Sequence, residues 1–198
     1  MENLVTLTIN STHFYLIGLP SGWLLVDAGW KLEQFTHQLK AYHIPLADIK
    51  YVMFTHHHPD HAGLIQDIKT LSGAKLIIHE KQIHYLDALW KYALKMGANQ
   101  PLRVEPGDLV SPDRDRLRSI GIRGELVETP GHSADSISLV LESGLAFTGD
   151  LPLPEFTTGD QQALVRQSWQ KLLARGARTF YPSHTAPLPA ERIHTARS

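Results

Sequence analysis

Four of the twelve histidines of this 198-residue chain lie within six consecutive positions, in the segment 55–61 (THHHPDH). An apolar run over residues 50–54 precedes the segment and predicts a buried strand. Apolar residues at helical spacing follow it, up to Gly73, and predict a helix. The histidine cluster is therefore expected at a strand-to-helix junction.

The spacing within this segment favours metal binding. His56 and His58 are two residues apart at the end of a strand, so their side chains project to the same side and can converge on one ion. Asp60 and His61 project from the start of the next helix and offer a carboxylate and an imidazole to a second ion. The chain has no cysteine, so nitrogen and oxygen must hold any metal, which suits zinc first and then iron, manganese or cobalt. The alternative for the segment taken alone is a polar loop that binds metal adventitiously.

Three further residues stand at the ends of expected strands and can complete the site. They are His132 after strand 124–129, Asp150 after strand 144–149 and His184 after strand 178–182. A carboxylate such as that of Asp150 can bridge two cations with its two oxygens. Taken one at a time, the two histidines would be interpreted as hydrogen-bonded structural residues and Asp150 as a turn residue. Their occurrence together with segment 55–61 favours a metal centre.

The remaining pattern predicts strands in two batches with helices between them. The other strands are expected at 4–9, 13–18, 22–27, 75–79 and 136–141, and the other helices at 31–43, 80–96 and 160–175. The polar, Pro- and Gly-rich stretch 97–118 is expected to be loop with a short strand at most. Two sheets with helices outside account for this order better than one parallel sheet or a β-sandwich. The length predicts a single domain over residues 1–198.

Charge and hydropathy exclude several classes of partner. The formal net charge of −1 provides no positive field for nucleic acid or an anionic membrane. No segment approaches the roughly 18 apolar residues of a transmembrane helix. The beginning of the chain has no basic stretch followed by an apolar one, so a cytoplasmic protein is expected.

The chain closely resembles the metallo-β-lactamase-fold hydrolase superfamily in its motifs and in their order. The motifs are those quoted above, together with LVDAG around Asp27, TPGHS around His132 and TGD at Asp150. The resemblance covers nearly the whole chain. It implies an α/β fold, a four-layer αβ/βα sandwich of two mixed β-sheets with helices on the outer faces, and a dinuclear site at one edge that holds two zinc ions, with iron or manganese as other candidates. It also implies that Asp27 supports the site without binding metal. The implied ligands are His56, His58 and His132 on one metal, Asp60, His61 and His184 on the other, and Asp150 bridging both.

Departures from better-known members narrow the choice within the superfamily. The absence of cysteine excludes the β-lactamases that bind the second metal with a cysteine. Asp150 argues against the β-lactamases that have a histidine at the place of that cysteine, because these generally lack the bridging aspartate. His58 stands where flavodiiron proteins have glutamate, and Leu153 stands where lactonases have a tyrosine. Few residues follow His184, which leaves no room for the helical domain of glyoxalase II. The chain therefore resembles a small glyoxalase II-like or lactonase-like member without a C-terminal domain.

The expected reaction is cleavage of a carbonyl ester, thioester or lactone by attack of a metal-bridging hydroxide, with the second metal or Asp60 assisting the leaving group. The apolar loop 151–159 favours a small-molecule substrate with an apolar acyl part, and segment 80–118 is the other candidate for specificity. Apolar residues in segment 80–96 suit a homodimer equally well. Two alternatives stay open: a persulfide dioxygenase with one iron on His56, His132 and Asp150, and a metal-loaded binding module.

Overall fold

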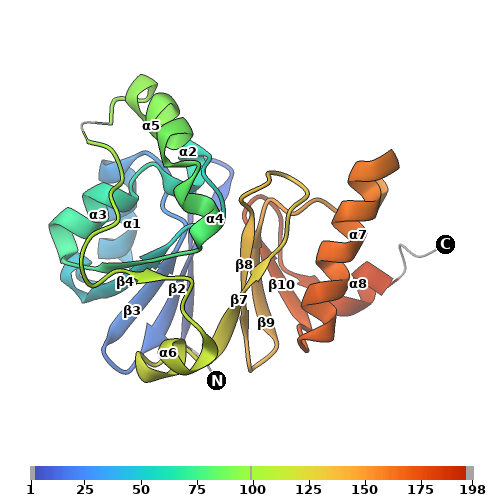
Figure 1. Ribbon diagram of the computed structural model, residues 1–198. Coiled ribbons are helices and arrows are strands. Elements are labelled where there is room, and N and C mark those ends of the chain that lie inside the picture. The colour runs from blue at the N-terminus through green and yellow to red at the C-terminus, as the bar shows by residue number, and fades with distance from the viewer. Residues whose placement is uncertain (1–2, 99, 195–198) are drawn as a thin grey trace. The chain divides into compact units, whose positions relative to one another are not determined.

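The structure of the protein, a computed structural model, describes residues 3–98 and 100–194. It contains two compact units, Met1–Pro112 and Asp113–Ser198, each built on one mixed β-sheet with helices (Figure 1). The predicted α/β class with two mixed sheets is confirmed. The expectation of a single domain over residues 1–198 stays a prediction. In the part of the chain that the structure describes, no helix is long and apolar enough to cross a membrane.

The sheet of the first unit has six strands in the order β1-β2-β3-β4-β5-β6. Strands β1 to β3 form the expected antiparallel meander, and β3 to β6 pair in parallel. In the β3–β4 register Val26 is opposite Met53, so the carboxyl ends of these two strands lie side by side. The strands are β1 (Leu4–Ile9), β2 (Thr12–Leu19), β3 (Gly22–Val26), β4 (Ile49–Met53), β5 (Lys75–Ile78) and β6 (Leu109–Val110).

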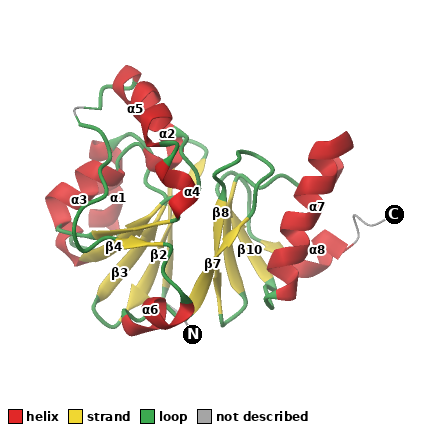
Figure 2. Cartoon of the chain, viewed as in Figure 1, coloured by secondary structure: helices red, strands yellow, loops and turns green. Residues whose placement is uncertain are grey.

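Helices α1 and α3 lie on one face of this sheet (Figure 2). Phe35 of α1 and Ile68 of α3 are fully buried in one core with Leu25 and Val52 of the sheet. Gly73 ends α3 in the left-handed conformation, with φ of 74°, as a C-terminal glycine commonly does. The helices of this unit are α1 (Leu32–Ala41), η1 (Leu46–Asp48), α2 (Pro59–Ala62), α3 (Ile65–Ser72), α4 (Glu80–Ile83) and α5 (Leu86–Lys95).

Two helices expected to be continuous are each divided in two. The helix after His58 is divided into α2 and α3 at Gly63, where a Cβ atom would lie 2.6 Å from the Pro59 carbonyl oxygen and 2.7 Å from that of Gly29. The helix expected over 80–96 is divided into α4 and α5 at His84 and Tyr85. Apolar periodicity could not reveal this close approach of Gly63 to the loop at Gly29.

The sheet of the second unit has five strands in the order β11-β10-β9-β8-β7. Strands β9 and β10 are parallel, and the other neighbours are antiparallel. Helix α7 packs Trp169 edge-on against Phe180 of β10, with ring centroids 4.8 Å apart. The elements are α6 (Arg114–Ser119), β7 (Gly124–Glu128), β8 (Ile137–Leu141), β9 (Leu145–Gly149), η2 (Pro154–Phe156), α7 (Gly159–Ala174), β10 (Thr179–Pro182), β11 (Leu188–Pro189) and α8 (Ala190–His194).

Helix α6 corrects the expectation that the whole stretch 97–118 is loop and short strand. The Asp113 carboxylate accepts a hydrogen bond from the backbone N–H of Arg116 at 2.8 Å and so caps the helix. Leu117 is fully buried and is the apolar anchor of the helix. One cap and one apolar anchor are enough for so short a helix, but they leave no periodic signal in a polar sequence.

Candidate metal centre

Asp27 joins the carboxyl ends of β3 and β4. Its backbone N–H donates to the Met53 carbonyl at 3.0 Å, and its φ of 61° turns the side chain onto the neighbouring strand. There the fully buried carboxylate accepts hydrogen bonds from the Thr55 backbone N–H at 2.7 Å and from the Thr55 hydroxyl at 2.9 Å. Asp27 thereby fixes the point at which the chain leaves β4 and enters the histidine segment.

The same carboxylate orients His61. Nδ1 of His61 lies 2.9 Å from Oδ2 of Asp27, and both side chains are almost completely buried. An ionised carboxylate only accepts hydrogen bonds, so Nδ1 carries the proton and Nε2 presents a lone pair. Nε2 faces the Asp60 carboxylate at 3.4 Å. His61 and Asp60 thus form a nitrogen–oxygen pair suited to one cation, with Asp27 in the supporting role that the sequence resemblance implied.

His56 and His58 form a second pair at the start of the same segment. Their ring atoms Nε2 and Nδ1 lie 2.9 Å apart, so the two imidazoles converge as their spacing predicted. The Thr55 hydroxyl proton is directed to Asp27, and its oxygen lies 3.2 Å from Nδ1 of His56. Nδ1 of His56 is then the donor of that bond, and the Nε2 lone pair points toward His58. Two nitrogen atoms so close need a proton or a cation between them.

Gln82, which the sequence analysis did not single out, supports this strand end from α4. Its buried side-chain amide donates to the Phe54 carbonyl at 2.8 Å, and its side-chain oxygen accepts from the His79 backbone N–H at 2.9 Å. His79 and Gln82 make up a reciprocal cap at the start of α4. The sequence carried no capping-box signal for this cap, because its first residue is a histidine and not Ser, Thr, Asp or Asn.

In the second unit, Asp150 lies between two histidines. Its Oδ2 atom is 3.5 Å from Nε2 of His132, and its Oδ1 atom is 3.3 Å from Nε2 of His184. The backbone N–H of Ser183 donates to the Gly149 carbonyl at 2.9 Å, which holds the ends of β9 and β10 together. One carboxylate with an imidazole nitrogen at each oxygen is the arrangement expected of a bridging ligand.

The His132 loop depends on a glycine beside α7. Gly131 has φ of 157°, and a Cβ atom there would lie only 2.7 Å from a methyl carbon of Val165. A side chain at this position would push the loop away from α7 and displace His132 from Asp150.

The residues therefore fit a metal, because the donors are imidazole nitrogens and carboxylate oxygens that face one another. The structure brings together the candidate ligands within each unit: His56 with His58, Asp60 with His61, and Asp150 with His132 and His184. The assignment of these seven residues to two shared metal ions stays a prediction.

The apolar loop 151–159 contributes less to a substrate site than its composition indicated. Leu151 is buried in the core of the second unit, and Leu153 packs against that core. Phe156 is 76% exposed and is the apolar side chain of this loop that remains available to a ligand. Leu151 and Leu153 thus contribute to the core of the second unit and not to a substrate site.

Comparisons with known proteins point to one family. The model of the metallo-beta-lactamase superfamily matches residues 7–184. The chain is 27% identical over 194 residues to the atrochrysone carboxyl ACP thioesterase AacuM of Aspergillus aculeatus, covering 95% of this chain and 55% of that protein. It is 31% identical to the beta-lactamase-like protein 2 homolog of Caenorhabditis elegans, covering 89% of this chain and 57% of that protein. The chain spans about half the length of these curated relatives.

Solved structures show the same fold. A metallo-beta-lactamase family protein of Thermus thermophilus has a TM-score of 0.71 at 22% identity, with 98% of this chain and 77% of that chain covered. The subclass B3 metallo-beta-lactamase BJP-1 of Bradyrhizobium japonicum has a TM-score of 0.70 at 19% identity, with 99% and 87% covered. The fold expected from the sequence is thereby confirmed.

Proposed function

The chain belongs to the metallo-β-lactamase superfamily, and from this premise we propose that it is a metal-dependent hydrolase that cleaves a carbonyl thioester, ester or lactone. The observation that carries the proposal is Asp150, whose two carboxylate oxygens each face an imidazole nitrogen. The proposed ligands are His56, His58 and His132 for one ion, Asp60, His61 and His184 for the other, and Asp150 for both.

Two bound zinc-type ions would lower the pKa of bound water to roughly 7 and would polarise the substrate carbonyl. The chain's own residues prepare the site for this chemistry. Asp27 keeps the proton of His61 on Nδ1, so that the Nε2 lone pair is directed at the ligand position. The Thr55 hydroxyl does the same for His56 by accepting from its Nδ1 atom. These two hydrogen bonds determine the tautomers of His61 and His56 before a metal binds.

Asp60 is the proposed group that handles the proton of the leaving group. Its carboxylate lies beside Nε2 of His61, and a quarter of its side chain is exposed to solvent. The carboxylate of Asp60 can thus reach both the proposed metal position and an incoming substrate. A thiolate leaving group needs little protonation, whereas an alkoxide needs it strongly, so the demand on Asp60 differs between thioesters and esters.

Among the carbonyl substrates we favour a thioester. The support is the relative AacuM, which is named a carboxyl ACP thioesterase and is similar over 95% of this chain. The β-lactamase BJP-1 is 19% identical and supports the fold alone. Exposed Phe156 offers contact to an apolar acyl part.

The test is metal content together with a hydrolysis panel. Elemental analysis of protein purified without added metal should give about two zinc-type ions per chain, and thioesters should be cleaved faster than aryl esters, lactones, β-lactams and phosphodiesters. Asp150→Asn should lose at least one ion and about 10²-fold or more in kcat, whereas Asp160→Asn, an exposed carboxylate on α7, should change neither. One iron per chain with oxygen consumption on persulfides would overturn the proposal in favour of a dioxygenase. Activity confined to phosphodiesters would also contradict it.

A further inference from the structure

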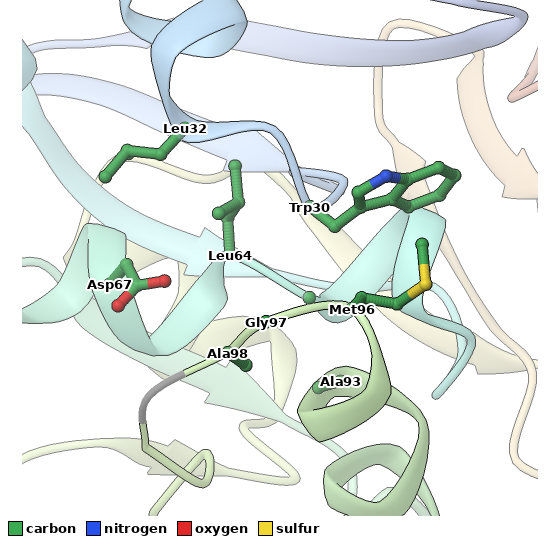
Figure 3. Close-up of a pocket in the computed structure, with 9 residues that line it drawn as sticks. Trp30, Leu32, Leu64, Asp67, Ala93, Met96, Gly97 and Ala98 are labelled. Atoms are coloured by element: carbon green, nitrogen blue, oxygen red, sulfur yellow. The ribbon is translucent and has the colours of Figure 1, made fainter.

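A cavity of about 170 Å³ lies inside the first unit, between the loop after β3, the start of α3 and the end of α5 (Figure 3). Its walls combine the apolar side chains of Trp30, Leu64, Ala93 and Met96 with polar surface. Gly97 borders it with φ of 90°, and a Cβ atom at this position would meet none of the described residues within 4 Å. The cavity has room for a ligand, since an engineered apolar cavity of about 150 Å³ accepts benzene.

One end of the cavity carries a charge. Figure 3 shows the Asp67 carboxylate at the end opposite Trp30 and Met96. Across residues 3–98 and 100–194 this carboxylate has neither a hydrogen bond nor an ion pair with another side chain or with the backbone. Asp67 is only partly exposed. A carboxylate in this position accepts hydrogen bonds from a ligand and repels an anion.

The other end of the cavity adjoins the residues of the histidine segment. Gly63 and Leu64 follow α2 directly, and the backbone N–H of Ala28 donates to the His61 carbonyl at 2.8 Å, which ties the Trp30 loop to α2. Trp30 also lines a second, narrow cavity of about 10 Å³ together with Asp60. Trp30 therefore borders both the Asp60 side and the larger cavity.

We propose that this cavity binds one arm of the substrate, a short apolar chain that ends in an N–H donor such as an amine or an amide. The apolar part would lie against Trp30, Leu64 and Met96, and the N–H group would donate to Asp67. An arm of equal length that ends in a carboxylate would be rejected, because it places a second negative charge beside Asp67. That the bound molecule is a substrate rests on the proposed function, but the preference for N–H over carboxylate does not.

Two four-carbon probes test the preference without any reaction. Titration of the full chain with n-butylammonium and with butanoate is followed by the NMR shifts of the backbone amides of Gly63, Leu64 and Gly97. The expected result is saturable binding of butylammonium at least about tenfold tighter than that of butanoate, which corresponds to about 1.4 kcal/mol. In Asp67→Asn the two affinities should become equal within about twofold. In the control Asp87→Asn, which removes an exposed carboxylate on α5 outside the cavity, the tenfold preference should persist.

Filling the cavity provides the second arm of the test. Met96 lines the cavity and is 48% exposed, so Met96→Trp adds volume there without disturbing the core. Leu94 is 55% exposed on the same helix and does not line the cavity, so Leu94→Trp is its matched control. Met96→Trp should abolish the shifts caused by butylammonium, and Leu94→Trp should retain them. Equal binding of both probes to the wild-type chain, or binding of neither, would overturn the proposal.

Hydrolysis by the same samples separates this proposal from the proposed function. If the wild-type chain cleaves thioesters but shows no preference between the probes, the hydrolase proposal stands and the cavity assignment is wrong. If butylammonium binds as expected but no carbonyl substrate is cleaved, the cavity assignment stands and the hydrolase proposal is wrong. When both hold, Asp67→Asn should raise KM for thioesters with an amide N–H in their arm and leave kcat within about twofold.

Discussion

The imidazole of His61 donates a hydrogen bond from Nδ1 to the Asp27 carboxylate at 2.9 Å, although the two residues lie 34 positions apart in the sequence. The bond links the end of β3 to the start of α2. It fixes the tautomer of a candidate ligand in a fully buried place, where rotation of the ring would remove one hydrogen bond from the Asp27 carboxylate. Asp27, which is not among the proposed ligands, thereby determines how the candidate ligand His61 presents its Nε2 atom.

Asp27→Asn should weaken metal binding about 10- to 100-fold, because an amide has one acceptor oxygen for the donors of Thr55 and His61. Competition with a chromophoric chelator measures the affinity. Asp87→Asn serves as a control, since Asp87 is exposed on α5. Unchanged affinity in Asp27→Asn, with the fold intact by circular dichroism, would show that His61 needs no such support.

Gln82→Met should destabilise the fold by about 1–3 kcal/mol, because the Phe54 carbonyl loses the buried donor that it has now. Urea denaturation of the metal-free chain measures the change in the free energy of unfolding. Metal affinity should fall as well, since the end of β4 loses its link to α4. Gln34→Met on the exposed side of α1 provides the matched substitution, for which we expect a change within about 0.5 kcal/mol.

Lys69 and Asp108 form a buried ion pair in the first unit, with Nζ 2.7 Å from Oδ2 and both side chains at most 2% exposed. Removing one partner by Lys69→Met should cost about 3–5 kcal/mol, because the Asp108 charge remains buried without its cation. Exposed Arg118, which pairs with Asp115 at 3.6 Å and with Glu142 at 2.6 Å, provides the comparison, and Arg118→Met should cost no more than about 1 kcal/mol. Equal losses for the two substitutions by urea denaturation would contradict this account.

Glu142 provides a prediction about pH. Hydrogen bonds from Arg118 and then from Arg123 lower the pKa of its carboxyl below the usual value of 4.5. A lowered pKa in the folded state means that the ion pairs stabilise the protein above about pH 4.5 and that this stabilisation is lost as the pH falls through the folded-state pKa. At a fixed salt concentration, the Tm difference between wild type and Glu142→Gln should thus be constant above about pH 5 and should shrink on further acidification. A Tm difference that grows as the pH falls would contradict this prediction.

Much of the secondary structure could be predicted, because the alternation of apolar and polar residues in strands and the spacing of apolar residues in helices depend only on neighbouring residues. The meander, the strand before the histidine segment and the helix over 160–175 all occur within a residue or two of their expected bounds. The exceptions are elements held by contacts distant in sequence. Gly63, between α2 and α3, lies close to the loop at Gly29, and α6 has a single buried residue, Leu117. Such contacts leave no periodic trace in the sequence.

By itself the sequence determined which side chains can bind metal, since the direction of neighbouring side chains follows from the backbone over two or three residues, as for His56 and His58. The absence of cysteine determined the type of donor. Only the tertiary structure decided what holds these groups in place: Gln82 at the end of β4, Asp27 at His61, and Trp30 and Asp67 around one cavity. The physical reason is that each of these contacts depends on how strand ends and helices separated by long stretches of chain come to lie beside one another.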